Sequence, residues 1–311
     1  MSAHERHLKL RHTSVLVRES GTGPAVVLIN GIGAHVAMWR PVEIALEGMR
    51  VISFDAPGTG RSATRLTPLT MFGLAGLVEQ LFDELQLERA DVIGYSFGGA
   101  IAQQFALQAP ARVRRLVLAA TLPGWGGVPG HLTAMLSVGT PLRYYSRTLY
   151  EITAPAVAGG RTRCDSDYVR SLWRDRAGHS PTFRGYAHQV WAMTMWSSFA
   201  WLSRIAAPTL IAVGDDDPLV PLSNALMMSL RMPRARVLVV PEEGHFLLLD
   251  PRGKGLPLAR EFLAADELES AEVWRSALSA DRERVRDQLR TDGLGALPWG
   301  IASALVRGVS R

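Results

Sequence analysis

The sequence predicts an α/β fold in which helices cover both faces of a doubly wound, mainly parallel sheet and an inserted helical segment forms a lid. Short apolar runs that fit buried strands alternate with stretches of helical periodicity through the first 120 residues, and the alternation resumes after residue 205. With 311 residues, of which 47% are hydrophobic and 20% charged, the chain can bury a large core as one domain.

The N-terminal residues predict two short strands. Leu8 and Leu10, and then Val15 and Val17, alternate with polar residues ahead of a turn at residues 21–24. Three histidines lie in this region, at positions 4, 7 and 12. Their spacing matches no pattern of metal ligands, so we expect a solvated hairpin and no metal site.

A glycine turn follows the next predicted strand, Ala25–Ile29. It reads Asn-Gly-Ile-Gly over residues 30–33 and is a natural place for one half of an oxyanion hole. A dinucleotide site is the rival interpretation, because its glycine turn also follows a strand and opens a helix. The dinucleotide fingerprint fails at its third glycine, where Val36 stands, and the chain has no Gly-Lys-Ser/Thr of a phosphate-binding loop. We therefore expect no nucleotide cofactor.

A strand at residues 51–54, a rigid loop at residues 55–62 and an amphipathic helix come next. The helix is indicated by apolar residues at helical spacing, namely Phe72, Ala75, Val78, Phe82 and Leu85. We expect these residues to lie in the core and not to form a cofactor site.

Residues 94–99, Gly-Tyr-Ser-Phe-Gly-Gly, predict a nucleophile elbow around Ser96. They follow a predicted strand that ends at residue 93 and precede helix formers at residues 100–107. Such a tight turn strains the serine backbone, and the absent Cβ atoms of Gly94 and Gly98 make room for it. A bare G-x-S-x-G would arise by chance in roughly one chain in six of this composition, so the flanking strand and helix carry the prediction.

A further buried strand is predicted at Val113–Ala119, and the pattern changes between residues 121 and 205. Five tyrosines and five tryptophans gather there, the latter being Trp125, Trp173, Trp191, Trp196 and Trp201. We interpret this segment as a lid. Most of the tryptophans would fill the segment's own core, and some would face the cleft.

The sheet is expected to resume at residues 209–213, where an acidic turn follows with aspartates at 215, 216 and 217. Another strand, at residues 236–240, leads to His245. Both turns follow strands of a parallel sheet, at the edge where Ser96 is also expected. The chain order serine, aspartate, histidine is that of a hydrolytic triad. The order alone leaves open which of the three aspartates belongs to it.

From about residue 15 to residue 263, the chain resembles the α/β-hydrolase superfamily, and within it the intracellular depolymerases of medium-chain-length poly(3-hydroxyalkanoates). The closer resemblance rests on residues 30–34, 98–100, 103–106, 118–121 and 214–221. It implies Ser96 as the nucleophile, Asp217 as the acid and His245 as the base. It also implies that the backbone N–H groups of Phe97 and Ile32 form the oxyanion hole.

The chain departs from the superfamily pattern at three places. Asn30 replaces the histidine that usually precedes the glycine, a departure shared with the depolymerase subgroup. Tyr95 and Phe97 flank the serine where valine and tryptophan are expected, and the chain continues well past the last expected helix. These departures leave the triad chemistry intact and bear on the substrate.

We expect four segments along the chain. Residues 1–120 and 206–265 form the two parts of the core, residues 121–205 the lid, and residues 266–311 an amphipathic C-terminal extension. The extension carries a helical pattern at Val273, Trp274, Ala277, Leu278, Val285 and Leu289, followed by apolar residues at 299, 301, 305 and 306. It either docks on the main domain or attaches to a hydrophobic surface or partner.

Charge and composition narrow the classes of function. The net charge is +5 but the arginines are scattered, so we expect no nucleic-acid partner. The apolar runs are shorter than the roughly 20 residues that a transmembrane helix needs. Residues 1–20 lack the apolar core of a signal peptide. Cys164 is the single cysteine, which excludes an internal disulfide and fits a reducing compartment. We therefore expect a cytoplasmic protein, associated with polymer granules if its substrate is the stored polyester.

The sequence predicts a carboxylic ester hydrolase that works in two steps without a metal or an organic cofactor. Its expected substrate is a hydrophobic ester or polyester, cleaved to 3-hydroxy acids by a polyhydroxyalkanoate depolymerase. The alternative is a small-molecule carboxylesterase, lactonase or carbon–carbon hydrolase that uses the same triad behind a different lid. A third hypothesis is a non-enzymatic protein that binds a surface or a partner.

Overall fold

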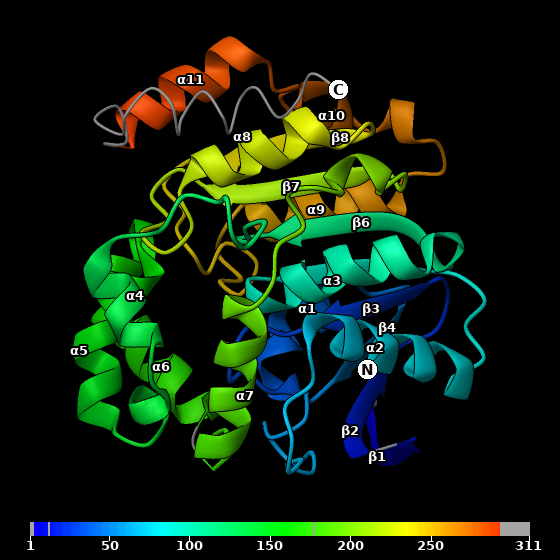
Figure 1. Cartoon of the computed structure of the whole chain (residues 1–311), viewed down its shortest axis with the longest axis vertical. Helices are drawn as coiled ribbons and strands as arrows, with labels where there is room; N and C mark the ends of the chain where they lie inside the picture. The colour runs from blue at the N-terminus through cyan, green and yellow to red at the C-terminus, as the bar shows by residue number, and fades with distance from the viewer. Residues whose placement is uncertain (1–2, 12, 177, 293–311) are drawn as a thin grey trace.

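The computed structural model describes residues 3–11, 13–176 and 178–292, and in this part of the chain eight strands form one sheet (Figure 1). The strands lie side by side in the order β1-β2-β4-β3-β5-β6-β7-β8. Their bounds are β1 Ala3–Leu10, β2 Thr13–Ser20, β3 Ala25–Ile29, β4 Arg50–Phe54, β5 Ala90–Tyr95, β6 Val113–Ala119, β7 Thr209–Gly214 and β8 Ala235–Val240. The predicted α/β fold is confirmed.

Strand pairing is antiparallel only at one edge of the sheet. β1 pairs with β2, and β2 with β4, in antiparallel register. All other neighbours are parallel, with Val27 of β3 opposite Val92 of β5 and Ile93 of β5 opposite Val117 of β6. Because parallel strands end at the same edge, the loops after β3, β5, β7 and β8 begin close together.

Helices cover both faces of the sheet. Their bounds are α1 Arg40–Ala45, α2 Met71–Glu84, α3 Phe97–Gln108, α8 Leu222–Arg231 and α9 Gly255–Ala264. Val27 and Ile29 of β3 belong to the apolar cluster that contains residues of α2, α3 and α8. Their neighbours Val26 and Leu28 belong to a second cluster with residues of α1 and α9. Successive strand side chains point to opposite faces, so one apolar run supplies both layers.

The prediction that Phe72 lies in the core is wrong. Phe72 is 65% exposed, whereas Ala75, Val78, Phe82 and Leu85 are buried. Successive helical residues are separated by about 100°, which places Phe72 well off the centre of the buried face of α2. Met71, one position earlier, lies on the buried face and is 2% exposed.

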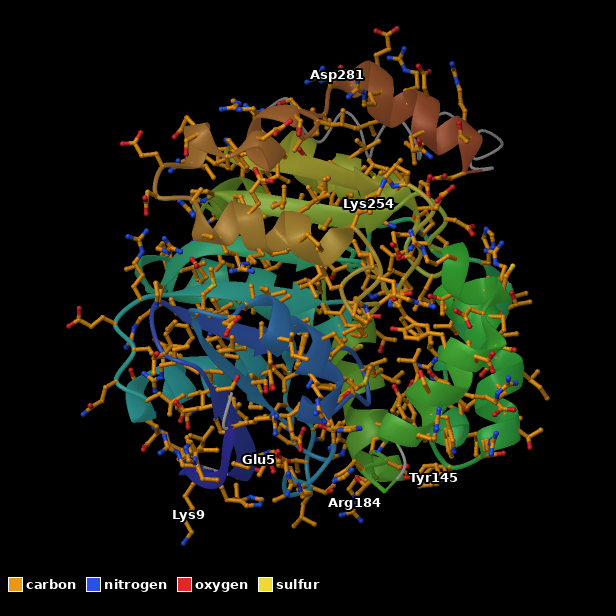
Figure 2. All side chains as sticks on the ribbon, turned by 180° about the vertical axis from the view of Figure 1, so that it is seen from behind. Glu5, Lys9, Tyr145, Arg184, Lys254 and Asp281 are labelled. Atoms are coloured by element: carbon orange, nitrogen blue, oxygen red, sulfur yellow. The ribbon has the colours of Figure 1, made fainter. Side chains whose placement is uncertain are left out.

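Between β6 and β7 the chain forms α4 Leu132–Val138, α5 Arg147–Ala158, α6 Ser166–Arg176 and α7 Phe183–Thr194, coloured green in Figure 1. We refer to residues 121–205 as the lid segment. Figure 2, seen from behind, shows Tyr145 and Arg184 together at its lower end. Tyr145, which precedes α5, stacks on Phe183 at 4.9 Å between ring centroids and so joins the α4–α5 connection to the start of α7.

The C-terminal extension does not form the single helix that its apolar pattern suggested. It contains α10 Glu272–Ser276 and α11 Arg282–Thr291, and between them Leu278 pairs with Val237 of β8. Val285 and Leu289 of α11 are buried in the cluster that includes α8. The pairing with the sheet edge takes Leu278 out of the helix, so the described part of the extension packs on the core. The apolar residues at 299, 301, 305 and 306 lie outside the described residues.

No helix in the described ranges has both the length and the apolar character needed to cross a membrane.

Candidate active site

Ser96 lies between the last residue of β5 and the first residue of α3. Its backbone has φ 53° and ψ −120°, a conformation that is strained for a residue with a side chain. A Cβ atom at Gly98 would lie 2.0 Å from the carbonyl oxygen of Ile29, and one at Gly94 would lie 2.6 Å from that of Gly98. The two glycines therefore permit the close approach of α3 to the sheet that the turn requires.

The backbone of Ser96 is also held by hydrogen bonds. Its N–H donates to the carbonyl oxygen of Ala119 at 2.8 Å, and the Thr121 hydroxyl donates to its carbonyl oxygen at 2.7 Å. Both partners come from β6 or the residues after it. The neighbouring strand thus fixes the strained turn, and α3 directs its positive end toward the Ser96 side chain.

His245 joins the serine to an aspartate. Its Nε2 atom lies 3.1 Å from Ser96 Oγ, and its Nδ1 atom lies 2.9 Å from Asp217 Oδ2. The histidine and aspartate side chains are buried, with exposed fractions of 4% and 0%. Three residues far apart in the sequence therefore meet at the edge of the sheet, in loops that follow β5, β7 and β8.

The structure separates the roles of the three adjacent aspartates. Asp217 Oδ1 accepts the backbone N–H groups of Leu219 and Val220, each at 2.9 Å, which leaves Oδ2 facing the imidazole. Asp216 is half-exposed and binds the backbone N–H of Gly160 at 2.9 Å and an arginine. Asp215 is exposed. Of the three carboxylates, that of Asp217 contacts His245 in the structure.

The glycine turn after β3 lies beside Ser96. A Cβ atom at Gly31 would lie 3.5 Å from Ser96 Cβ. Two side chains of the lid segment hold this turn: the Tyr144 hydroxyl donates to the carbonyl oxygen of Ile32 at 2.7 Å, and Gln189 Oε1 accepts the N–H of Gly33 at 2.9 Å. Phe97 is the first residue of α3, where a backbone N–H has no partner within the helix.

A small cavity of about 20 Å³ is lined in part by Ser96 and His245. The lid segment contributes Val138, Arg143, Tyr144 and Val157 to its lining. None of the five tryptophans is among these described lining residues, so the expectation that some would face the cleft does not hold for this cavity. Trp196 instead packs on Trp201 and donates to a glutamine of α3, because an indole N–H buried with its ring needs an acceptor.

Two carboxyl groups have raised pKa values in loops near this edge. Burial raises the pKa of Glu243, on the loop after β8, although Arg161 opposes this effect. Burial also raises the pKa of Asp55, although it accepts hydrogen bonds from backbone N–H groups. One of these donors, Val36, lies 2.7 Å away and begins the helical turn after the glycine turn. Glu243 forms an ion pair with Arg161 of the lid segment and Asp55 accepts the Val36 N–H, so each carboxyl links two separate segments of the chain.

Sequence reasoning missed Arg143, Tyr144 and Gln189, which cover the site or hold its glycine turn. The richness of the segment in tyrosine was the only local signal, and it did not single out one residue. Within the residues that the structure describes, no three histidine, cysteine, aspartate or glutamate side chains gather as metal ligands would.

The chain is similar in sequence to known hydrolases. A family model described as the alpha/beta hydrolase fold matches residues 24–251. The chain is similar to a poly(3-hydroxyalkanoate) depolymerase of Ectopseudomonas oleovorans, with 37% identity over 240 residues, covering 76% of this chain and 83% of the relative. A pimeloyl-acyl-carrier-protein methyl ester esterase of Nitrosomonas europaea is 29% identical over 245 residues, covering 75% and 92%.

Among solved structures, the chain is similar in fold to the enol-lactonase of Burkholderia xenovorans LB400. The TM-score is 0.72 at 22% identity, and the match covers 84% of this chain and all of the other.

Proposed function

The chain belongs to the α/β-hydrolase family, and on this basis we propose that it is a serine hydrolase of ester bonds, acting as a poly(3-hydroxyalkanoate) depolymerase that releases 3-hydroxy acids. The observation that carries the proposal is the chain of contacts from Ser96 through His245 to Asp217, at 3.1 and 2.9 Å. A buried imidazole between a hydroxyl and a carboxylate is the arrangement that activates a serine.

The reaction proceeds in two steps. His245 Nε2 takes the proton of Ser96 Oγ as the oxygen attacks the ester carbonyl, and the same nitrogen then protonates the leaving alcohol. Asp217 keeps the other ring nitrogen protonated and stabilises the imidazolium. Water, activated by His245, then hydrolyses the acyl-enzyme and frees the acid.

The negative charge of each tetrahedral intermediate falls on the carbonyl oxygen. We assign its stabilisation to the backbone N–H groups of Ile32, in the glycine turn after β3, and of Phe97, at the start of α3. The hydrogen bond from Tyr144 to the carbonyl of Ile32 supports this role, because it restrains the turn that contains the Ile32 N–H. Closure of the lid segment would therefore also position the oxyanion hole.

A second cavity supports an extended apolar substrate. It has a volume of about 370 Å³ and is lined in part by Ile44, Leu172 and Leu249. Met38 lines this cavity and also the one beside Ser96. A movement of the Met38 side chain would join the two spaces and admit an acyl chain. Leu172→Trp, at a residue that lines this cavity and not the one beside Ser96, should then shorten the preferred acyl chain.

The outer surface of the lid segment supports a water-insoluble polymer as substrate. Large apolar side chains are exposed on α4, α5 and the turn between them, namely Leu132, Met135, Leu136, Leu142, Leu149 and Ile152. Apolar surface gathered in one region marks an interaction site more often than scattered exposed residues do. We propose that this surface rests on the polyester granule while the site beneath acts on single chains.

The test combines soluble esters with polymer. Wild-type protein should hydrolyse para-nitrophenyl esters with a preference for medium chains in a series from C2 to C12, and it should release 3-hydroxy acids from amorphous granules. Ser96→Ala protein should sediment with the granules but release nothing. Leu132→Ser together with Leu136→Ser should weaken sedimentation without changing hydrolysis of the soluble esters.

A small-molecule esterase or lactonase is the second candidate, favoured by the small size of the cavity at Ser96. A preference for C2 to C4 esters with no monomer release from granules would establish it and refute the depolymerase. Binding to granules without hydrolysis of any ester would instead favour a surface-binding protein.

A further inference from the structure

Arg143 is a buried cation in the cover of the candidate active site. It belongs to the short helical turn Pro141–Tyr144 between α4 and α5, and it is 6% exposed. It lines the same cavity as Ser96 and His245. Neither the candidate triad nor the two steps of ester hydrolysis require this side chain.

The guanidinium has unused hydrogen-bonding capacity. Its Nη2 atom donates to the Tyr144 hydroxyl at 3.2 Å, and that hydroxyl donates in turn to the carbonyl of Ile32. Its Nε and Nη1 atoms are buried and have no hydrogen-bond partner in the part of the chain that the structure describes. Buried donors of this kind are normally satisfied, so the two atoms point to a missing acceptor.

The charge of Arg143 is also uncompensated. No aspartate or glutamate of the described ranges forms an ion pair with it, and the polar side chains that interact with it are those of Tyr144, Tyr186 and Tyr150. Arginine remains protonated at any pH at which the protein is folded. A buried cation without a counter-ion is costly, and a carboxylate is the partner that satisfies both its charge and its donors.

We propose that Arg143 binds the free carboxylate at the end of the substrate chain, so that the protein cleaves the ester bond nearest to that end. This inference rests on the proposed function and specifies its substrate as an oligoester of 3-hydroxy acids with a free carboxyl terminus. In such a chain, two carbon atoms separate the terminal carboxylate carbon from the last ester oxygen. A carboxylate held beside the cavity therefore leaves that ester within reach of Ser96.

The proposal accounts for repeated cleavage. Ser96 Oγ bonds to the carbonyl carbon as the ester C–O bond breaks, and the terminal 3-hydroxy acid leaves with a proton from His245. Water then releases the shortened chain from Ser96. Its new end is again a carboxylate, which Arg143 can bind for the next cycle. The cavity of about 20 Å³ is too small for this ligand, so the Pro141–Tyr144 turn must move for it to enter.

The experiment measures selectivity for the carboxylate. The substrates are the linear dimer of 3-hydroxyoctanoate as the free acid and as its methyl ester, and cleavage of the internal ester is followed by chromatography. We expect wild-type kcat/KM to be about ten- to a hundredfold higher for the free acid, as for a hydrogen bond to a charged group. Arg143→Met should reduce this ratio to near one, and Arg143→Lys should retain part of it.

Arg147→Met is the matched control, because Arg147 lies four residues away but is exposed and paired with Glu151. This variant should keep the wild-type ratio. Equal rates of wild-type protein on the two dimers would overturn the proposal, as would an equal loss on both dimers in Arg143→Met.

A binding measurement keeps the inference testable if Arg143→Met does not fold. Calorimetry on Ser96→Ala protein should show tighter binding of 3-hydroxyoctanoate than of its amide, and equal affinities would refute the anion site. This result does not depend on catalysis. A protein that prefers the carboxylate but cleaves no ester would contradict the proposed function and support the role of Arg143.

Discussion

Replacement of Asp217 by asparagine should abolish most of the activity by reversing the tautomer of His245. In the structure, Asp217 Oδ1 accepts two backbone N–H groups at 2.9 Å. In the asparagine variant, an NH₂ group in place of Oδ1 would face these two N–H donors. The amide oxygen must therefore occupy the Oδ1 position. The NH₂ group then faces His245 Nδ1 at about the 2.9 Å of the native contact.

This geometry sets the size of the effect. With a donor opposite Nδ1, the imidazole must accept there and carry its proton on Nε2, which lies 3.1 Å from Ser96 Oγ. A protonated Nε2 cannot take the serine proton. Loss of the correct tautomer in a serine triad lowers kcat about 10⁴-fold, which corresponds to about 5 kcal/mol of transition-state stabilisation.

The assay is kcat on a para-nitrophenyl ester of medium chain length, with thermal unfolding as the check on folding. Asp216→Asn is the control, because this half-exposed residue binds Gly160 and an arginine rather than the imidazole, and it should retain activity within a few-fold. The reasoning fails if Asp217→Asn keeps more than about a tenth of wild-type kcat, or if Asp216→Asn is the inactive variant.

Three further predictions concern stability. Ser96→Gly should be more stable than Ser96→Ala by about 1 kcal/mol in urea unfolding, because glycine tolerates the positive φ, and equal stabilities would contradict the strain. Gly98→Ala should lower the free energy of unfolding by several kcal/mol or prevent folding, because its Cβ would lie 2.0 Å from the Ile29 carbonyl oxygen. Gly76→Ala is the control: this glycine faces open space on α2, so the substitution should leave stability unchanged or raise it. Burial alone would raise the pKa of the Glu5 carboxyl, but hydrogen bonds from Arg61 and Arg18 outweigh burial, and the net effect lowers this pKa. The ion pairs of Glu5 therefore stabilise the fold above the ordinary pKa of glutamate, and this stabilisation is lost as the pH falls through the lowered pKa. Glu5→Gln should therefore lower Tm by at most about 2 °C at pH 7, because a partly exposed ion pair contributes about 1 kcal/mol or less. The difference in Tm from wild type should shrink as the pH falls below the ordinary pKa of glutamate.

Local patterns in the sequence determined the framework of the core. The strands expected at Ala25–Ile29 and Val113–Ala119 have those bounds in the structure, and the helix after Ser96 begins one residue beyond it. A helix that packs on the sheet shows apolar residues at helical spacing, and a buried parallel strand is apolar on both faces. Each element can therefore be recognised from a few adjacent residues. The meeting of Ser96, His245 and one of the three aspartates at 215–217 could also be anticipated, because parallel strands end at one edge, whereas the family resemblance was needed to single out Asp217.

Periodicity was insufficient where a contact from elsewhere in the chain decided the outcome. Phe72 is apolar and lies on a correctly predicted helix, but the buried face of α2 includes Met71 and leaves Phe72 exposed. Leu278 fits a helical pattern, but pairing with Val237 at the edge of β8 takes it out of the helix. In both cases the packing partner lies outside the sequence window from which the prediction was made.

The sequence by itself determined the parallel sheet, the strained turn at Ser96 and the order in which the candidate triad residues enter the site. Only the tertiary structure decided what covers that site. Tyr144 reaches the carbonyl of Ile32 across 112 residues because the lid segment packs over the glycine turn, and the same packing buries Arg143 with no carboxylate of the described residues paired to it. Hydrogen bonds and charge burial of this kind depend on which surfaces meet in space, and no short-range pattern records them.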